Sequence, residues 1–102
     1  GRADDMLIVR GVNLYPSAVE DVLGGFPEIV EYQIRVDHAA SLPELILRIE
    51  LSAGCPDPKA VIQRIQTSLH ASFNLRIPIL LAPAGTLPRF EMKARRWFGG
   101  IR

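Results

Sequence analysis

Apolar and polar residues alternate along two stretches in the middle of the chain. Within residues 32–36 and again within residues 45–51, every second side chain is apolar. Successive side chains of a β-strand point to opposite faces of the sheet, so this period predicts two strands that each bury one face. Residues 38–43 between them are few enough to join the strands as an antiparallel hairpin. The polar residues Arg48 and Glu50 of the second strand are expected on the unburied face.

A helical period replaces this alternation in a short stretch nearer the start of the chain. Pro16 is tolerated in the first turn of a helix, and residues 17–23 follow it. Their apolar side chains fall on one face: Val19, Val22 and Leu23. The pair Gly24-Gly25 then predicts the end of the helix, because glycine is best suited to a left-handed cap.

A longer helix is predicted after Asp57-Pro58, which combines an N-cap residue with a first-turn proline. It is expected to run to about Asn74, since asparagine can serve as a C-terminal cap. The apolar stripe of this helix consists of Val61, Ile62, Ile65, Leu69 and Phe73.

The two ends of the chain hold shorter elements. Residues 6–9 and 12–14 are predicted to form a small hairpin that reverses at Arg10-Gly11, where glycine supplies backbone freedom. Near the other end, residues 77–82 read as a third strand. Its Pro78 predicts an edge position or the start of the strand, because proline cannot donate to a sheet ladder.

The remaining C-terminal residues are interpreted as an irregular loop over 83–88 and a short helix over 91–97. The predicted fold class is α+β: a small, mostly antiparallel sheet of about three strands, packed against two helices and preceded by a short β-hairpin. This order of elements also suits a ferredoxin-like regulatory or RNA-binding domain. Because one fold carries many functions, topology alone does not choose among them.

Composition narrows the choice. The chain has 102 residues, enough for one domain, and 48% of them are hydrophobic, enough for a modest core. Its formal net charge of +1 gives no case for nucleic acid or for an anionic membrane surface. No apolar run approaches the length of a membrane span, and no secretory signal is visible.

The cysteine and the histidines give little chemistry. Cys55 stands alone, which excludes an internal disulfide and a CxxC metal site and fits a reducing cytoplasm. His38 and His70 are too dispersed to suggest a metal site or a catalytic triad. We therefore expect a cytoplasmic protein without a metal site of its own.

Two motifs carry a resemblance to a known family. Residues 1–17 read G-R-x-D-D-M-L-I-x-R-G-x-N-x-x-P-S, and residues 87–96 read L-P-R-F-E-M-K-A-R-R. They resemble the opening motif and the lysine motif of the small C-terminal domain of adenylate-forming enzymes, the ANL superfamily. The residues of both motifs are most similar to those of the phenylacetate–CoA ligase branch of acyl-CoA ligases. Two motifs in this order and at this separation are more specific than either alone.

The resemblance covers essentially the whole chain, residues 1–102. It implies the mobile C-terminal lid domain of a larger ligase, with a hinge and hairpin motif in 1–16 and a catalytic lysine motif in 87–97. The chain also begins without Met, inside a motif, so we expect a fragment that lacks the large N-terminal domain. That domain is the implied partner, and without it the fragment is expected to be inactive.

The implied activity is that of an AMP-forming acid–thiol ligase. A carboxylic acid and Mg-ATP would give an acyl-adenylate and pyrophosphate, and the thiol of coenzyme A would then displace AMP. The implied cofactors are thus ATP, Mg²⁺ and coenzyme A, bound mainly with the absent domain. The acid cannot be named from this chain, because its pocket lies in that domain.

Lys93 is the implied catalytic residue. The family's lysine at this motif position contacts the carboxylate substrate and the α-phosphate of ATP. A flexible point charge with three donors suits the negative charge that develops during attack on phosphorus. Phe90 stands where the family usually has a small hydroxyl residue, and Met92 where it usually has glycine. The resemblance therefore does not determine the course of the loop that carries the lysine. The plain alternative is a solvated surface lysine.

Three further residues match family positions. Asp4 corresponds to the hinge about which the lid rotates, and Arg2 to an arginine that approaches the ribose and phosphates of the nucleotide. Gly11 corresponds to a glycine that borders the channel of the coenzyme A arm. The alternatives are surface residues for Arg2 and Asp4, and a glycine needed only for its turn for Gly11. The arginines near Lys93 are either a phosphate-facing patch or a solvated tail: Arg89, Arg95 and Arg96.

Two other classes of protein stay open. One is a free-standing ferredoxin-like regulatory or ligand-binding domain. The other is an adenylating enzyme that loads a carrier protein instead of free coenzyme A. Trp97 and Phe98 are interpreted as docking or core aromatics, and no nucleic-acid or membrane partner is expected. A homodimer is a further possible assembly, because some members of the family dimerise.

Overall fold

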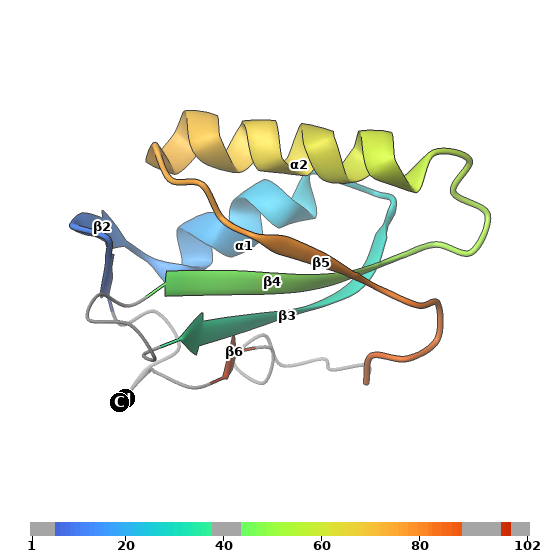
Figure 1. The fold of residues 1–102 in the computed structure, drawn as a ribbon, viewed down its shortest axis with the longest axis horizontal. Coiled ribbons are helices and arrows are strands. Elements are labelled where there is room, and N and C mark those ends of the chain that lie inside the picture. The colour runs from blue at the N-terminus through green and yellow to red at the C-terminus, as the bar shows by residue number, and fades with distance from the viewer. Residues whose placement is uncertain (1–5, 38–43, 89–96, 99–102) are drawn as a thin grey trace.

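Two helices cover one face of a four-stranded sheet, and a short hairpin lies at one end of this layer (Figure 1). The computed structural model describes residues 6–37, 44–88 and 97–98. In chain order the elements are β1 (Leu7–Val9), β2 (Val12–Leu14), α1 (Pro16–Gly24), β3 (Ile29–Asp37), β4 (Glu44–Leu51), α2 (Pro58–Phe73), β5 (Ile79–Ala82) and β6 (Trp97–Phe98).

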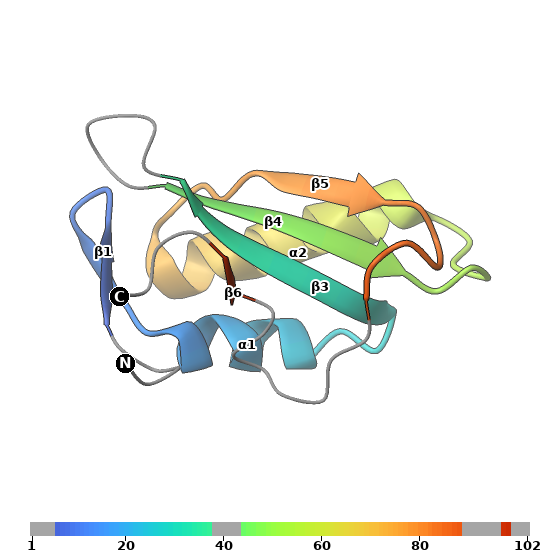
Figure 2. The same cartoon turned by 90° about the horizontal axis from the view of Figure 1, so that it is seen from below.

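The main sheet has the strand order β5-β4-β3-β6 and mixed pairing (Figure 2). Strands β3 and β4 are antiparallel, as predicted, and Ile34 lies opposite Leu47. Strand β5 runs parallel to β4, and β6 runs parallel to β3. The α+β class is confirmed; beyond the three predicted strands the sheet has the short β6, and its long central β3–β4 pair is antiparallel whereas both outer pairs are parallel. The reason is that α2 returns the chain along the sheet, so β5 starts at the same end as β4.

The edge position predicted for the strand with Pro78 is confirmed. Strand β5 begins at Ile79, directly after the proline, and pairs with β4 alone among the described strands. The carbonyl of Pro78 accepts a hydrogen bond from the backbone amide of Leu47 at 2.9 Å. Proline therefore contributes its acceptor to the sheet at a position where no donor is needed.

The helix predicted over 91–97 is wrong at its last residue, because Trp97 belongs to β6 and pairs with Ile34. Residues 91–96 lie outside the described residues. The pairing of β6 with β3 is a tertiary contact, which local sequence preference does not reveal.

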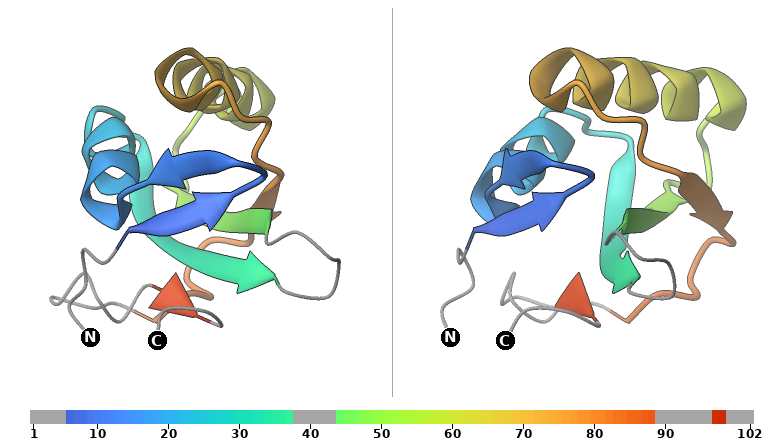
Figure 3. Two further views of the ribbon diagram at one scale, coloured as in Figure 1. Left: turned by 90° about the vertical axis from the view of Figure 1, so that its left-hand side faces the viewer. Right: turned by 60° about the vertical axis from the view of Figure 1, so that its left-hand side comes forward.

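The core lies between the sheet and the two helices, on the face that the alternating pattern predicted (Figure 3). Both helices lie on the same side of the sheet when it is seen end-on. The side chains with no exposed surface come from β2, α1, β3, β4 and α2 and include Leu14, Val19, Ile34, Leu47, Ile49, Ile65 and Leu69. Ile62 and Phe73 of the predicted stripe are partly buried beside this core.

The ends of α2 follow their sequence signals, whereas the end of α1 does not. The Asp57 side chain accepts a hydrogen bond from the Ala60 amide at 3.2 Å, and Asn74 adopts the left-handed conformation with φ 53°. Gly25, after α1, has φ −78°, so the predicted left-handed cap is wrong there. Its amide instead donates to the Val22 carbonyl at 3.1 Å, which continues a tight right-handed turn.

Candidate functional site

The hairpin of β1 and β2 turns through two residues with positive φ. Arg10 has φ 49° and Gly11 has φ 80°, and Val9 lies opposite Val12. Two central residues with positive φ are characteristic of the type I′ turn, whose twist matches that of the flanking strands. The turn predicted at Arg10-Gly11 is therefore confirmed. Val9 and Leu14 of the hairpin are buried and attach it to the core.

Gly11 lies at an exposed tip. A Cβ atom added there would meet no other heavy atom within 4 Å among the described residues. The positive φ therefore requires glycine at this position, whereas the packing of the domain does not. The tip leaves open space that a neighbouring domain or a ligand could approach.

A hollow of about 360 Å³ lies beside this hairpin. The turn, the start of β4 and the connection from α2 to β5 line it, with Arg10, Glu44, Gln66 and Arg76 among its polar residues. Arg10 and Glu44 form an ion pair across the hollow's rim, which joins the hairpin to β4. This exposed ion pair adds a charged contact between the hairpin and β4 to the packing of Val9 and Leu14 in the core.

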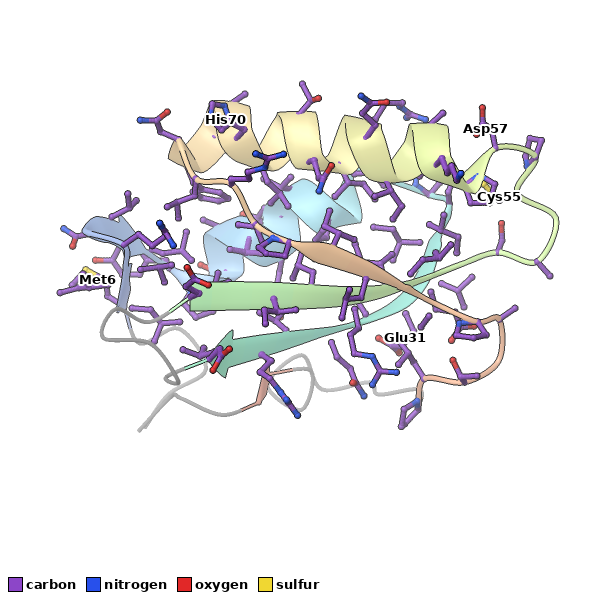
Figure 4. The ribbon with its side chains drawn as sticks, viewed as in Figure 1. Met6, Glu31, Cys55, Asp57 and His70 are labelled. Atoms are coloured by element: carbon purple, nitrogen blue, oxygen red, sulfur yellow. The ribbon has the colours of Figure 1, made fainter. Side chains whose placement is uncertain are left out.

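The face of the sheet away from the helices carries two buried carboxylates. Glu31 and Glu50 lie opposite each other on β3 and β4, and only 3% and 2% of their surfaces are exposed. In Figure 4, Glu31 lies beneath the sheet, on the side away from α2. The expectation that Glu50 lies on an unburied face is wrong, because the connection after β5 turns beneath the sheet and covers it.

Glu50 accepts two hydrogen bonds from this connection. The Gly85 amide donates to Oε2 at 2.8 Å, and the Leu87 amide donates to Oε1 at 3.1 Å. Leu87 is the first residue of the predicted lysine motif and is itself buried. One side chain on β4 therefore holds the point at which the motif begins.

Sequence reasoning missed Glu50. The only local signal was a carboxylate in a strand of otherwise mainly apolar residues, followed much later in the chain by a loop that contains a glycine. Of the residues predicted from the motifs, Gly11 is the one that the structure describes. Lys93, Arg2 and Asp4 lie outside the described residues, as do Phe90 and Met92.

The described residues offer neither a metal cluster nor a membrane-spanning helix. No group of three or more His, Cys, Asp or Glu side chains there could hold a metal ion. Within the same ranges, no helix has the length and the apolar character needed to cross a membrane.

Similarity to known proteins identifies the family of the chain. The family described as the AMP-binding enzyme C-terminal domain matches residues 11–99. The chain belongs to this family.

Its relatives include phenylacetate–CoA ligases. The enzyme of Thermus thermophilus is 36% identical, over 89% of this chain and 24% of its own length. A domain of phenylacetate–CoA ligase from Bacteroides vulgatus has a TM-score of 0.73 and 31% identity, covering 95% of this chain and 93% of that one. A 2-hydroxyisobutyryl-CoA ligase has a TM-score of 0.79 and 27% identity, covering 98% of this chain and 22% of that one. The chain thus spans about a quarter of the curated ligases that it matches.

Proposed function

We propose that this domain is the mobile C-terminal part of an AMP-forming acyl-CoA ligase, similar to phenylacetate–CoA ligase. The enzyme would join a carboxylic acid to ATP as an acyl-adenylate and then transfer the acyl group to coenzyme A. The observation that carries the proposal is the family match over residues 11–99, which includes the motif lysine Lys93. Similarity to curated phenylacetate–CoA ligases supports the same class of reaction.

The two half-reactions need different protein groups in one pocket. In the first, a carboxylate oxygen attacks the α-phosphorus of ATP, and pyrophosphate leaves. Negative charge spreads over the phosphoryl oxygens, and in this proposal Lys93 stabilises it while Arg2 contacts the nucleotide. ATP would arrive as its magnesium complex, with the cation held mainly by phosphate oxygens.

In the second half-reaction, the thiol of coenzyme A loses its proton and attacks the acyl carbonyl, and AMP leaves. The domain would rotate about Asp4, withdraw Lys93 and present the Gly11 hairpin to the channel of the coenzyme A arm. A closed site in both poses would also keep water from the reactive adenylate.

The arrangement of the described elements supports one lid with two working ends. The Gly11 hairpin lies at one end of the sheet, and the loop that leads into the lysine motif lies at the other end (Figures 1 and 2). A rotation could therefore exchange the two at a fixed pocket. The related 2-hydroxyisobutyryl-CoA ligase has been solved in a postadenylation state and in a thioesterification state with coenzyme A.

The test is pyrophosphate–ATP exchange by the full-length enzyme over a panel of aromatic and aliphatic acids. We expect Lys93→Ala to abolish acid-dependent exchange while thioester formation from preformed acyl-adenylate is largely kept. Lys59→Ala, which removes the exposed lysine at the start of α2, is the matched control and should leave exchange unchanged.

Three results would count against the proposal. Unchanged exchange in Lys93→Ala would overturn the role of this lysine. Absence of exchange with any acid in the wild-type enzyme would favour a ligand-binding domain. Failure of free coenzyme A together with success of a carrier protein would change the acceptor and keep the adenylating step.

A further inference from the structure

We infer that Glu50 is a positioning residue for the adenylation step, because it fixes the start of the segment that carries Lys93. The inference rests on the proposed function and adds to it a residue outside both motifs. It concerns the connection after β5, where the chain leaves the sheet and enters the lysine motif.

The strand register places the Glu50 carboxylate at this exit. Glu50 pairs with Ala82, the last residue of β5, so the β4–β5 ladder ends beside it. Beyond Ala82 the chain turns: the Thr86 amide donates to the Pro83 carbonyl at 3.2 Å, and Gly85 has φ 80°. The two amides bound by Glu50 lie in and directly after this turn, at Gly85 and Leu87.

Both oxygens of the carboxylate are used in this contact. Hydrogen bonds from backbone amides to a carboxylate are charge-assisted and stronger than bonds between neutral groups. The Leu87 contact is buried, and a buried amide without an acceptor is costly. The turn is therefore held in one conformation by a side chain from a different strand.

An amide side chain could not replace this contact. Glutamine has nearly the size of glutamate but offers one oxygen and one NH₂ group. One of the two backbone amides would then face a donor instead of an acceptor. Glu50→Gln thus tests the contact with almost no change in volume.

Strand pairing does not explain the presence of this carboxylate. Glu31 lies directly opposite Glu50, and its own Oε1 accepts the Tyr32 amide at 3.0 Å. Two carboxyl side chains on directly opposite residues of a sheet do not gain the attraction of an opposite-charge pair. A residue that departs from local sheet preference in this way is typical of a functional position.

The link to Lys93 is the length of the chain between them. Lys93 follows Leu87 by six residues, which span at most about 21 Å when fully extended. Fixing Leu87 therefore limits how far the backbone of Lys93 can lie from the turn after β5. A displacement of a catalytic group by about 1 Å can reduce the rate roughly 10²-fold.

The experiment measures both half-reactions in the full-length enzyme. We expect Glu50→Gln to reduce pyrophosphate–ATP exchange roughly 10- to 100-fold through kcat. Thioester formation from preformed acyl-adenylate should stay close to the wild-type rate. Glu50→Asp, which keeps the charge and shortens the side chain, should lie between wild type and Glu50→Gln. Glu28→Gln removes the carboxylate that pairs with Arg64, elsewhere in the domain, and should affect neither half-reaction.

A double variant separates positioning from general destabilisation. In the Lys93→Ala background, where exchange is already abolished, Glu50→Gln should leave thioester formation from preformed acyl-adenylate at the rate of Lys93→Ala alone, because the only group that Glu50 positions is absent. An equal loss in both half-reactions, unchanged exchange in Glu50→Gln, or failure of both Glu50 variants to fold would overturn the positioning role. If Lys93→Ala abolishes exchange in the same experiment, the proposed function survives that result. If Lys93→Ala leaves exchange intact, both proposals are overturned.

Discussion

Arg64 donates a hydrogen bond from Nη1 to the carboxylate of Glu28 at 3.1 Å, joining α2 to the connection between α1 and β3. The same guanidinium lies over the ring of Phe26, with Cζ 5.4 Å from the ring centroid. The pKa of Glu28 is lowered, first by a hydrogen bond from its own backbone amide and then by the Arg64 hydrogen bond. This cluster attaches the second helix to the first half of the fold.

The lowered pKa of Glu28 predicts a loss of stability in acid. Because the folded state favours the ionised carboxylate, its contribution is full above the unfolded pKa of about 4.3 and is lost as pH falls through the folded value. Glu28→Gln should therefore weaken the pH dependence of the free energy of unfolding in this acidic range. Urea unfolding at a series of pH values checks this. Identical acid dependence in wild type and variant would contradict it.

Two substitutions of Gly11 distinguish backbone strain from side-chain bulk at the hairpin tip. Gly11→Ala should lower the free energy of unfolding by about 1 kcal/mol, because alanine disfavours the positive φ while meeting no steric contact in this domain. Gly11→Asn should cost less, since asparagine tolerates that conformation better.

The second readout for these Gly11 variants is the thioester-forming half-reaction of the full-length enzyme. If the tip borders the channel of coenzyme A, Gly11→Asn should slow this step although the turn is kept. A normal rate in Gly11→Asn would leave the turn as the sole reason for glycine here.

Ile49 and Leu81 are register partners on β4 and β5 with opposite environments. Ile49 has no exposed surface, whereas 50% of Leu81 is exposed. Ile49→Ala should lower the free energy of unfolding by about 2–5 kcal/mol, because it removes buried methyl groups and leaves a cavity. Leu81→Ala should change it by no more than about 0.5 kcal/mol. Denaturant unfolding of the two variants compares them, and similar losses would show that this face of β5 is not on the surface.

Local patterns in the sequence were sufficient for the elements but not for every pairing. The two-residue period located β3 and β4, and the residues Asp57 and Asn74 located both ends of α2, because these signals depend on neighbouring residues. The direction of β5 and the pairing of Trp97 depend on how distant segments meet. Neither a proline nor an aromatic residue determines that by itself.

Part of the candidate site could be predicted from the sequence, and part could not. Resemblance to family motifs predicted Lys93, Asp4, Arg2 and Gly11, and the turn conformation expected at Gly11 is confirmed. Glu50 belongs to neither motif, and its alternating position predicted a solvent-facing side chain. Its burial follows from the course of the chain beyond β5, which no window of the sequence around Glu50 contains.

The parallel pairing of β5 with β4 bears on the order in which the domain assembles. Ile34 and Leu47 are joined by a short connection, but Leu47 and Ile79 meet only after α2 has crossed the sheet. Closing the longer loop costs more chain entropy, so the β3–β4 hairpin is expected to form earlier in folding than the β4–β5 pair. By the same reasoning, the turn after β5 is expected to settle onto Glu50 late, once the hairpin that supplies this side chain is in place.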